Sequence, residues 1–130
     1  MITRKIHMFS KIHIKEPYVF RVQYQDETTA EEAKSKHRQL HRNMYKNIQS
    51  TWGYSTVRDE DIPSNETERL ITSHHLSYQT SNVKHVRRGY FFFTDELDGM
   101  QFMLSSNAIK LSMWPDNLVF TIHEVINTES

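Results

Sequence analysis

Basic side chains recur every four positions along one segment of the chain, and that spacing suits phosphate binding. Residues 34–46 contain five Lys or Arg and no Asp or Glu. Residues four apart share one face of an α-helix, and four of the five follow that spacing: Lys34, Arg38, Arg42 and Lys46. Like charges at this spacing destabilise a helix, and nucleic-acid phosphates would offset their repulsion. The alternatives are a solvated helix face and a surface that docks on an acidic protein.

A second basic group follows later in the chain. Lys84, Arg87 and Arg88 lie within five residues of one another, and they are candidates to extend the phosphate-binding surface. Reading a base usually takes Asn, Gln or Arg aimed into a groove, whereas Lys and Arg along a helix match a charged backbone. If nucleic acid is bound, we therefore expect residues 34–46 to contact phosphates and not bases.

Aromatic side chains could serve binding in a different way. Residues 90–93 are four consecutive aromatics, and successive residues of a strand point to opposite faces. If helices cover one face of the sheet, two of these rings remain for base stacking or for a protein interface. Large aromatics dominate the energetics of protein interfaces, and five are our interface candidates: Trp52, Tyr54, Phe91, Phe93 and Trp114.

Metal binding and catalysis find less support in the residue pattern. His37 and His41 are four apart, which can bring two imidazoles to one metal ion, but no third ligand is indicated. Arg38 stands where the H-E-x-x-H metalloprotease motif needs its Glu. No nucleophile, base and orienting group occur together in a recognisable pattern. We expect no catalytic residue, no metal and no cofactor, and a protein that is not an enzyme.

Helical spacing predicts the element that carries the basic stripe. Thr29 and Glu32 match the capping box that begins a helix, and Gly53 suits its end. Apolar residues then recur at helical spacing over residues 29–49. A second helix is predicted from residues 94–95 to about residue 104, with three carboxylates in its first turns. A short third helix is predicted over residues 66–73.

Alternating or apolar segments predict strands over residues 11–15, 19–24, 86–93, 108–113 and 118–125. We expect the last two to form a hairpin, residues 59–63 to be an acidic surface loop, and Gly89 to mark a bulge. This order predicts an α+β fold with a mostly antiparallel sheet and two main helices on one face, of which a ferredoxin-like arrangement is one realisation. The expected core residues are Ile12, Ile14, Phe20, Val22, Leu40, Met44, Ile48, Leu97, Met103, Leu104, Phe120 and Ile122.

Length and composition indicate one globular domain over residues 1–130. The chain is 37% hydrophobic and 25% charged, and no apolar run is long enough to cross a bilayer. Cysteine is absent, and the N-terminal sequence lacks the apolar region of a signal peptide. A cytoplasmic protein without membrane contact is therefore expected. The scarcity of Gly, Ala and Pro is typical of A+T-rich genomes, which makes a viral origin, and a location in the host cytoplasm or a virion, a hypothesis.

The sorting of charge along the chain gives two hypotheses about function. Residues 1–46 hold ten Lys or Arg and five Asp or Glu, whereas residues 47–130 hold six and eleven. Opposite charges on two regions allow a protein to assemble with copies of itself or with a partner of complementary charge. Our leading hypothesis is a binding or assembly protein that acts through protein contacts. The second is nucleic-acid binding through phosphates along the basic helix.

Overall fold

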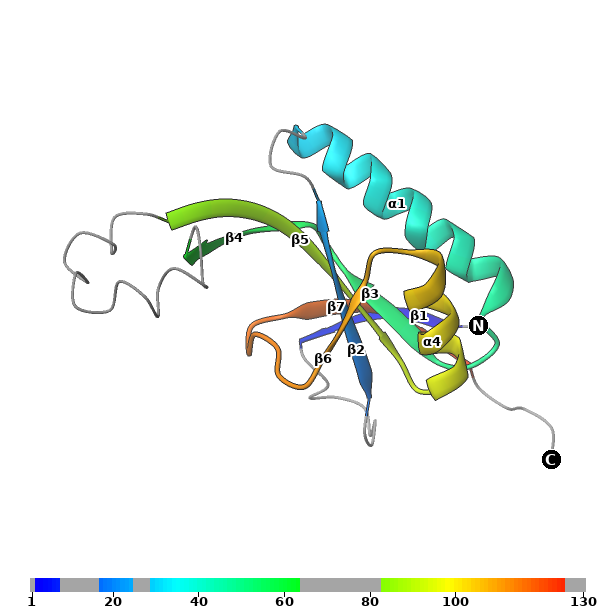
Figure 1. Cartoon of the computed structure of the whole chain (residues 1–130). Coiled ribbons are helices and arrows are strands. Elements are labelled where there is room, and N and C mark those ends of the chain that lie inside the picture. Colours follow the sequence, from blue (N-terminus) through cyan, green and yellow to red (C-terminus); the bar gives the residue numbers. More distant parts are fainter. Residues whose placement is uncertain (1, 8–16, 25–28, 64–82, 126–130) are drawn as a thin grey trace, which may run out of the picture.

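The described residues form one antiparallel sheet with two helices packed on one face (Figure 1). The computed structural model describes residues 2–7, 17–24, 29–63 and 83–125. The strands are β1 (Ile2–His7), β2 (Tyr18–Tyr24), β3 (Trp52–Ser55), β4 (Arg58–Pro63), β5 (Val83–Phe93), β6 (Ile109–Leu111) and β7 (Val119–Glu124). The helices are α1 (Ala30–Asn47) and α4 (Glu96–Ser105). This architecture confirms the predicted α+β class.

Strand β5 is the centre of the sheet. The order of the strands is β1-β7-β3-β5-β2-β6, and β4 also pairs with β5. All four aromatics of β5 are at most 1% exposed. Phe91 and Phe93 pack beneath the helices, whereas Tyr90 and Phe92 join a second apolar cluster on the opposite face. Both faces of β5 are therefore covered, and none of these four rings is available for base stacking.

Residues 59–63, expected to be an acidic loop, belong instead to strand β4. Each carboxylate lies near a basic group of β5: Asp59 near Arg87 at 3.6 Å, Glu60 near Arg88 at 3.0 Å, and Asp61 near His85. The antiparallel register places these acidic and basic side chains on neighbouring strands. Cross-strand pairs of opposite charge stabilise a sheet, so this acidic run can form a strand here.

The hairpin expected from residues 108–113 and 118–125 does not form. Strand β6 pairs with β2, and β7 pairs with β1 and β3. Leu118 is 1% exposed, and half-buried Trp114 packs against the same cluster on the face opposite the helices. Burial of this connection on that face lets it carry the chain across the sheet, so the two strands lie apart.

Helix α1 begins and ends close to the predicted bounds. The Thr29 hydroxyl accepts a hydrogen bond from the Glu32 backbone N–H at 3.2 Å, which is half of the expected capping box. Ala33, His37 and Met44 are buried on the sheet, and the Ile48 backbone N–H donates to the Met44 carbonyl at the C-terminal end. The helix axis lies across the sheet in Figure 1.

Helix α4 begins after Asp95, as predicted, but a different face of it is buried. Leu97 and Leu104, expected in the core, are 72% and 82% exposed. The inward face carries Gly99 and Phe102 instead. A Cβ on Gly99 would lie 2.7 Å from the Phe20 ring, so the glycine lets the helix approach the sheet closely. Aromatic packing of Phe102 then decides which side of the helix faces inward.

The other core predictions have mixed outcomes. Six of the expected residues are buried: Phe20, Val22, Met44, Ile48, Phe120 and Ile122. Leu40 and Met103 are partly buried against the same core. Ile12, Ile14, the strand over residues 11–15 and the helix over residues 66–73 lie outside the described residues.

Candidate functional site

The basic stripe lies on the exposed surface of α1, outside the face that packs on the sheet. Lys34, Arg38, Arg42 and Lys46 are all exposed, whereas Ala33, His37 and Met44 are buried. Lys34 has Glu31 at 4.0 Å, one turn earlier. In the part of the chain that the structure describes, Arg38 and Arg42 form no ion pair. Their guanidinium groups can therefore bind an anion from outside the fold.

His37, which the sequence offers as a metal ligand, is a hydrogen-bonded core residue. Its Nε2–H donates to the Ser55 carbonyl at 2.5 Å, because a carbonyl can only accept. Nδ1 therefore accepts from the Tyr24 hydroxyl at 2.6 Å. Burial lowers the pKa of His37, partly offset by the Ser55 bond, and favours the neutral ring. Both ring nitrogens are occupied, and neither is free for a metal.

Gly89 makes room for this histidine. A Cβ there would lie 2.3 Å from the His37 ring. The register between β2 and β5 runs without interruption through the pair of Val22 with Gly89. No bulge interrupts this pair of strands. On the other side of β5 the register shifts by one residue between the pairs Tyr54 with Phe91 and Arg58 with Arg88, so the expected irregularity lies opposite Gly89 and Tyr90. The glycine also serves the close approach of α1 to the sheet.

His41 is held against the sheet as a neutral ring. Its ring stacks on Tyr54 with centroids 3.9 Å apart and planes 2° from parallel. Burial lowers the pKa of His41 to about 4, with contributions from the positive charges of nearby histidines and of Arg38 and Arg42. The imidazole is neutral at pH 7, so the positive charge of this surface comes from its lysines and arginines. No group of three or more possible ligands is arranged for a metal among the described residues.

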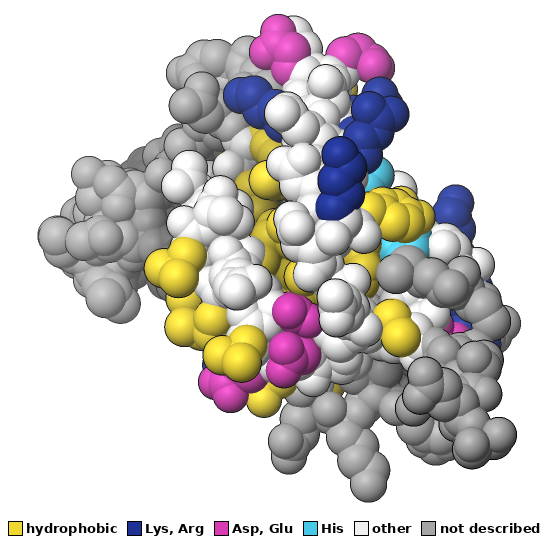
Figure 2. All heavy atoms as spheres, turned by 90° about the vertical axis from the view of Figure 1, so that its right-hand side faces the viewer, with side chains coloured by type: hydrophobic (Ala, Val, Ile, Leu, Met, Phe, Trp, Pro, Cys, Tyr) yellow, Lys and Arg dark blue, Asp and Glu magenta, His cyan; other side chains and the backbone are white. Residues whose placement is uncertain are grey.

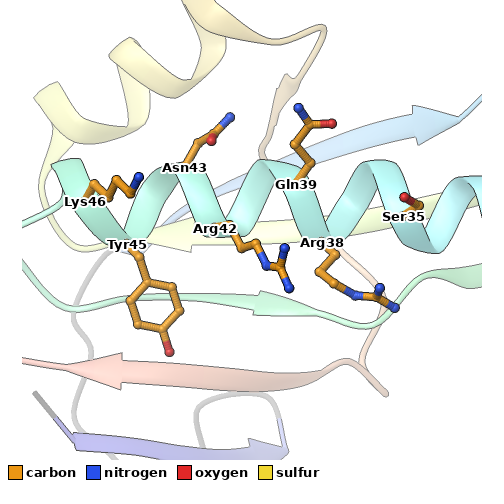
Figure 3. Close-up of a pocket in the computed structure, with 7 residues that line it drawn as sticks. All are labelled: Ser35, Arg38, Gln39, Arg42, Asn43, Tyr45 and Lys46. Carbon is orange, nitrogen blue, oxygen red and sulfur yellow. The ribbon is translucent and has the colours of Figure 1, made fainter.

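Arg38, Arg42 and Tyr45 share one flank of α1. Figure 3 shows these three side chains on the side of the helix toward β3 and β7, whereas Gln39 and Asn43 project from the other side. Residues of both groups, together with Ser35 and Lys46, line a surface depression of about 630 Å³. The flank thus combines two cations that have no ion-pair partner among the described residues with Tyr45, a residue that is 46% exposed.

Two buried rings support Tyr45 from beneath. Its centroid is 4.2 Å from that of His123 and 5.8 Å from that of Trp52, with interplanar angles of 60° and 89°. Trp52 and His123 are both fully buried. These contacts hold one part of the Tyr45 ring, while the other part is open to solvent.

The sheet beside this flank adds another cation. The Thr3 hydroxyl and His123 Nδ1 are 2.8 Å apart, so Thr3 points to the same face of the sheet as α1. Lys5 lies two residues farther along β1 and therefore points to that face as well. Lys5 is exposed, as is Val119 on β7. Figure 2 shows Lys and Arg side chains beside the helix, next to histidine and hydrophobic side chains.

The second basic group does not extend this surface. The Arg88 side chain is 11% exposed, donates from Nη1 to Glu60 at 3.0 Å and from Nε to Gln23 at 3.0 Å. Arg87 faces the Asp59 carboxylate. The Lys84 side chain lies outside the described residues. Arg87 and Arg88 therefore balance the acidic strand β4, and the candidate site consists of α1 and its neighbouring strands.

The expected interface aromatics lie mainly inside the fold. Trp52, Phe91 and Phe93 are completely buried and cannot contact a partner in this structure. Tyr54 is half-buried beneath His41, and Trp114 is half-buried against the second apolar cluster. Three exposed apolar side chains lie together on α4: Leu97, Met100 and Leu104. Others are spread over β6, β7 and the segments that follow them: Ile109, Met113, Val119 and Val125.

The sequence contains signals for two features that its periodicity did not predict, namely the exposed apolar face of α4 and the position of Tyr45 beside the basic stripe. Gly99 three residues before Phe102 gives an inward face for α4, which leaves Leu97, Met100 and Leu104 at helical spacing outside. Tyr45 follows Arg42 by three residues, which places it beside the basic stripe. In each helix a second set of apolar residues follows the same helical spacing. Periodicity alone therefore does not decide which set faces the sheet.

Comparisons of this chain with models of protein families, with curated proteins and with solved structures gave no match. Among the described residues, no helix is both long enough and apolar enough to span a bilayer.

Proposed function

We propose that the protein is a non-enzymatic binding protein whose helix α1 binds the phosphate backbone of nucleic acid. The observation that carries the proposal is the pair Arg38 and Arg42, exposed and one turn apart, with no carboxylate partner among the described residues. Arginines of the sheet such as Arg4 and Arg88 are paired with Glu124 and Glu60. Cations left unpaired at helical spacing favour a ligand with regularly spaced negative charges.

The first test removes both arginines and measures binding as a function of salt. Single- and double-stranded oligonucleotides of several sequences are titrated by fluorescence anisotropy between about 50 and 200 mM salt. The double variant Arg38→Ala, Arg42→Ala is expected to bind every sequence more weakly. Because each phosphate contact contributes about one unit, the slope of log affinity against log salt should become shallower by up to about two units.

A matched control removes the same charge elsewhere. Lys36 lies on the other flank of α1, beside β2, and exposed Lys110 lies on β6. The variant Lys36→Ala, Lys110→Ala should keep the original slope. If the two double variants lose the same amount of affinity, the loss would result from the lower net charge and not from the position of the arginines. Absence of binding by the unmutated protein at low salt would refute the proposal, and an acidic protein surface would then be the ligand to test on this flank.

A second candidate function is self-association through the outer face of α4. Leu97 and Leu104 are 72% and 82% exposed, and Met100 between them is 37% exposed. Their spacing of three and four residues places them on one side of the helix, where they form an apolar stripe. Figure 2 shows hydrophobic side chains exposed at the surface of the molecule. Two copies of such a stripe can pair antiparallel about a two-fold axis, with Leu97 of each copy against Leu104 of the other. This arrangement also opposes the two helix dipoles.

Sedimentation velocity tests the second candidate. At tens of micromolar the protein should sediment at about twice its 15.6 kDa chain mass. The variant Leu104→Lys should shift the population to the monomer, because a charge then meets an apolar side chain of the other copy. Ser112→Lys, a control at an exposed residue in the connection between β6 and β7, should not. A purely monomeric unmutated protein would rule out this contact.

A further inference from the structure

Beside the phosphate-binding residues lies an aromatic ring with the properties of a stacking platform. Resting on the proposed function, we infer that the flank formed by Arg38, Arg42 and Tyr45 prefers single-stranded nucleic acid and stacks an unpaired base on Tyr45. Binders of single strands combine cations that follow the backbone with aromatic rings that stack on bases. Bases in a duplex are already stacked on one another, so the ring favours a single strand.

Tyr45 is held in place before any ligand binds. Trp52 and His123 lie against one part of its ring and are themselves fully buried. An exposed aromatic side chain that is already ordered loses little conformational freedom on binding. With 46% of the residue exposed, part of the side chain remains open for contact.

The spacing along α1 suits a strand that runs parallel to the helix. Arg38 and Arg42 are one turn apart, about 6 Å along the axis at 1.5 Å per residue, which is comparable to the separation of neighbouring phosphates. Tyr45 follows about 4.5 Å farther along the same flank. One strand can therefore place successive phosphates at the two arginines and a base at the ring.

Lys5 supplies a cation on the opposite side of this path. It pairs in register with Thr121 of β7, and Thr121 pairs with Tyr54 of β3, over which His41 of α1 is stacked. Lys5 and the arginines thus lie on either side of β7, and the neutral His41 and Tyr54 lie between them. A polyanion over β7 would meet positive charge on both sides.

Tyr45 has an alternative role as a cover over Trp52 and His123, and the choice of variants separates the two roles. Tyr45→Leu keeps an apolar cover but removes the ring, whereas Tyr45→Phe keeps the ring and removes only the hydroxyl. Both are compared with the unmutated protein by anisotropy on single- and double-stranded oligonucleotides of matched length, over the same series of salt concentrations. Thermal unfolding of each variant is recorded in parallel.

The inference makes a specific set of expectations. The unmutated protein should bind the single strand more tightly than the duplex. Tyr45→Leu should weaken single-strand binding by about 5- to 150-fold and leave duplex binding and the salt slope unchanged. Tyr45→Phe should bind both like the unmutated protein. A single strand that contains 2-aminopurine should lose fluorescence on binding to the unmutated protein, and this quenching should vanish with Tyr45→Leu.

The outcomes distinguish this inference from the proposed function. If the double arginine variant weakens binding but Tyr45→Leu leaves the ratio of single-strand to duplex affinity unchanged, phosphate binding stands and base stacking is refuted. Equal losses on both ligands with a lowered melting temperature would assign Tyr45 to covering the core and would also overturn the inference. If the unmutated protein binds neither ligand at low salt, both ideas fail.

Discussion

Replacing Phe102 with alanine is expected to destabilise the protein by about 3–5 kcal/mol, whereas Leu104→Ala should change its stability by less than about 0.5 kcal/mol. Phe102 is 1% exposed, and its ring centroid lies 4.5 Å from Phe91, 5.3 Å from Phe93 and 6.1 Å from Phe20. Removing it would leave a cavity among these rings. Leu104, on the same helix, is 82% exposed and fills no such space.

Denaturant unfolding measures both changes in stability. The protein concentration is kept low, because self-association through α4 would otherwise contribute to the measured stability. The two variants differ in which side of α4 they alter, and the comparison therefore reports the orientation of the helix directly. A large loss of stability for Leu104→Ala with a small one for Phe102→Ala would mean that α4 buries the face predicted from periodicity, and the structure of this helix would be incorrect.

Replacing Glu60 with alanine is expected to cost about 3–5 kcal/mol, because it leaves a buried guanidinium without its counter-charge. Glu60 accepts hydrogen bonds from Arg88 at 3.0 Å and from the Tyr90 hydroxyl at 2.6 Å, and Arg58 lies 3.1 Å away. Burial raises the pKa of Tyr90 to about 12, and the bond to Glu60 adds to the rise, so its hydroxyl remains a donor.

The neighbouring residue on β4 provides the control. Asp59 is paired with Arg87 at 3.6 Å, but its side chain is 80% exposed, and such pairs contribute little. Asp59→Ala should therefore change the free energy of unfolding by less than about 0.5 kcal/mol. Glu60→Gln, which keeps one acceptor, should fall between the two. Similar small effects for Glu60→Ala and Asp59→Ala would show that Arg88 is not held as a buried ion.

Local interactions made several elements predictable. The capping residues Thr29 and Glu32, together with the apolar spacing after them, were enough to place α1 within one or two residues, because a helix depends on contacts three and four residues apart. The same holds for Asp95 at the start of α4 and for the strand patterns that became β2, β5 and β7. The exposure of the basic stripe followed from the same periodicity, since the apolar residues of α1 occupy the other side.

Contacts between distant segments decided the rest. The acidic run of β4 pairs with the part of β5 that carries Arg87 and Arg88, and its carboxylates bind these two arginines. The arginines are thereby removed from the predicted phosphate site. The pairing of β6 with β2 instead of β7 depends on burial of the connection between them.

The amino-acid sequence by itself therefore determined the fold class, the bounds of α1 and the basic side of that helix. Tertiary structure alone decided which aromatics are buried, which face of α4 is exposed, and that Tyr45 lies beside Arg42 above Trp52 and His123. The physical reason is that periodicity states which residues share a face, whereas the choice between two regular faces depends on packing against partners far away in the chain.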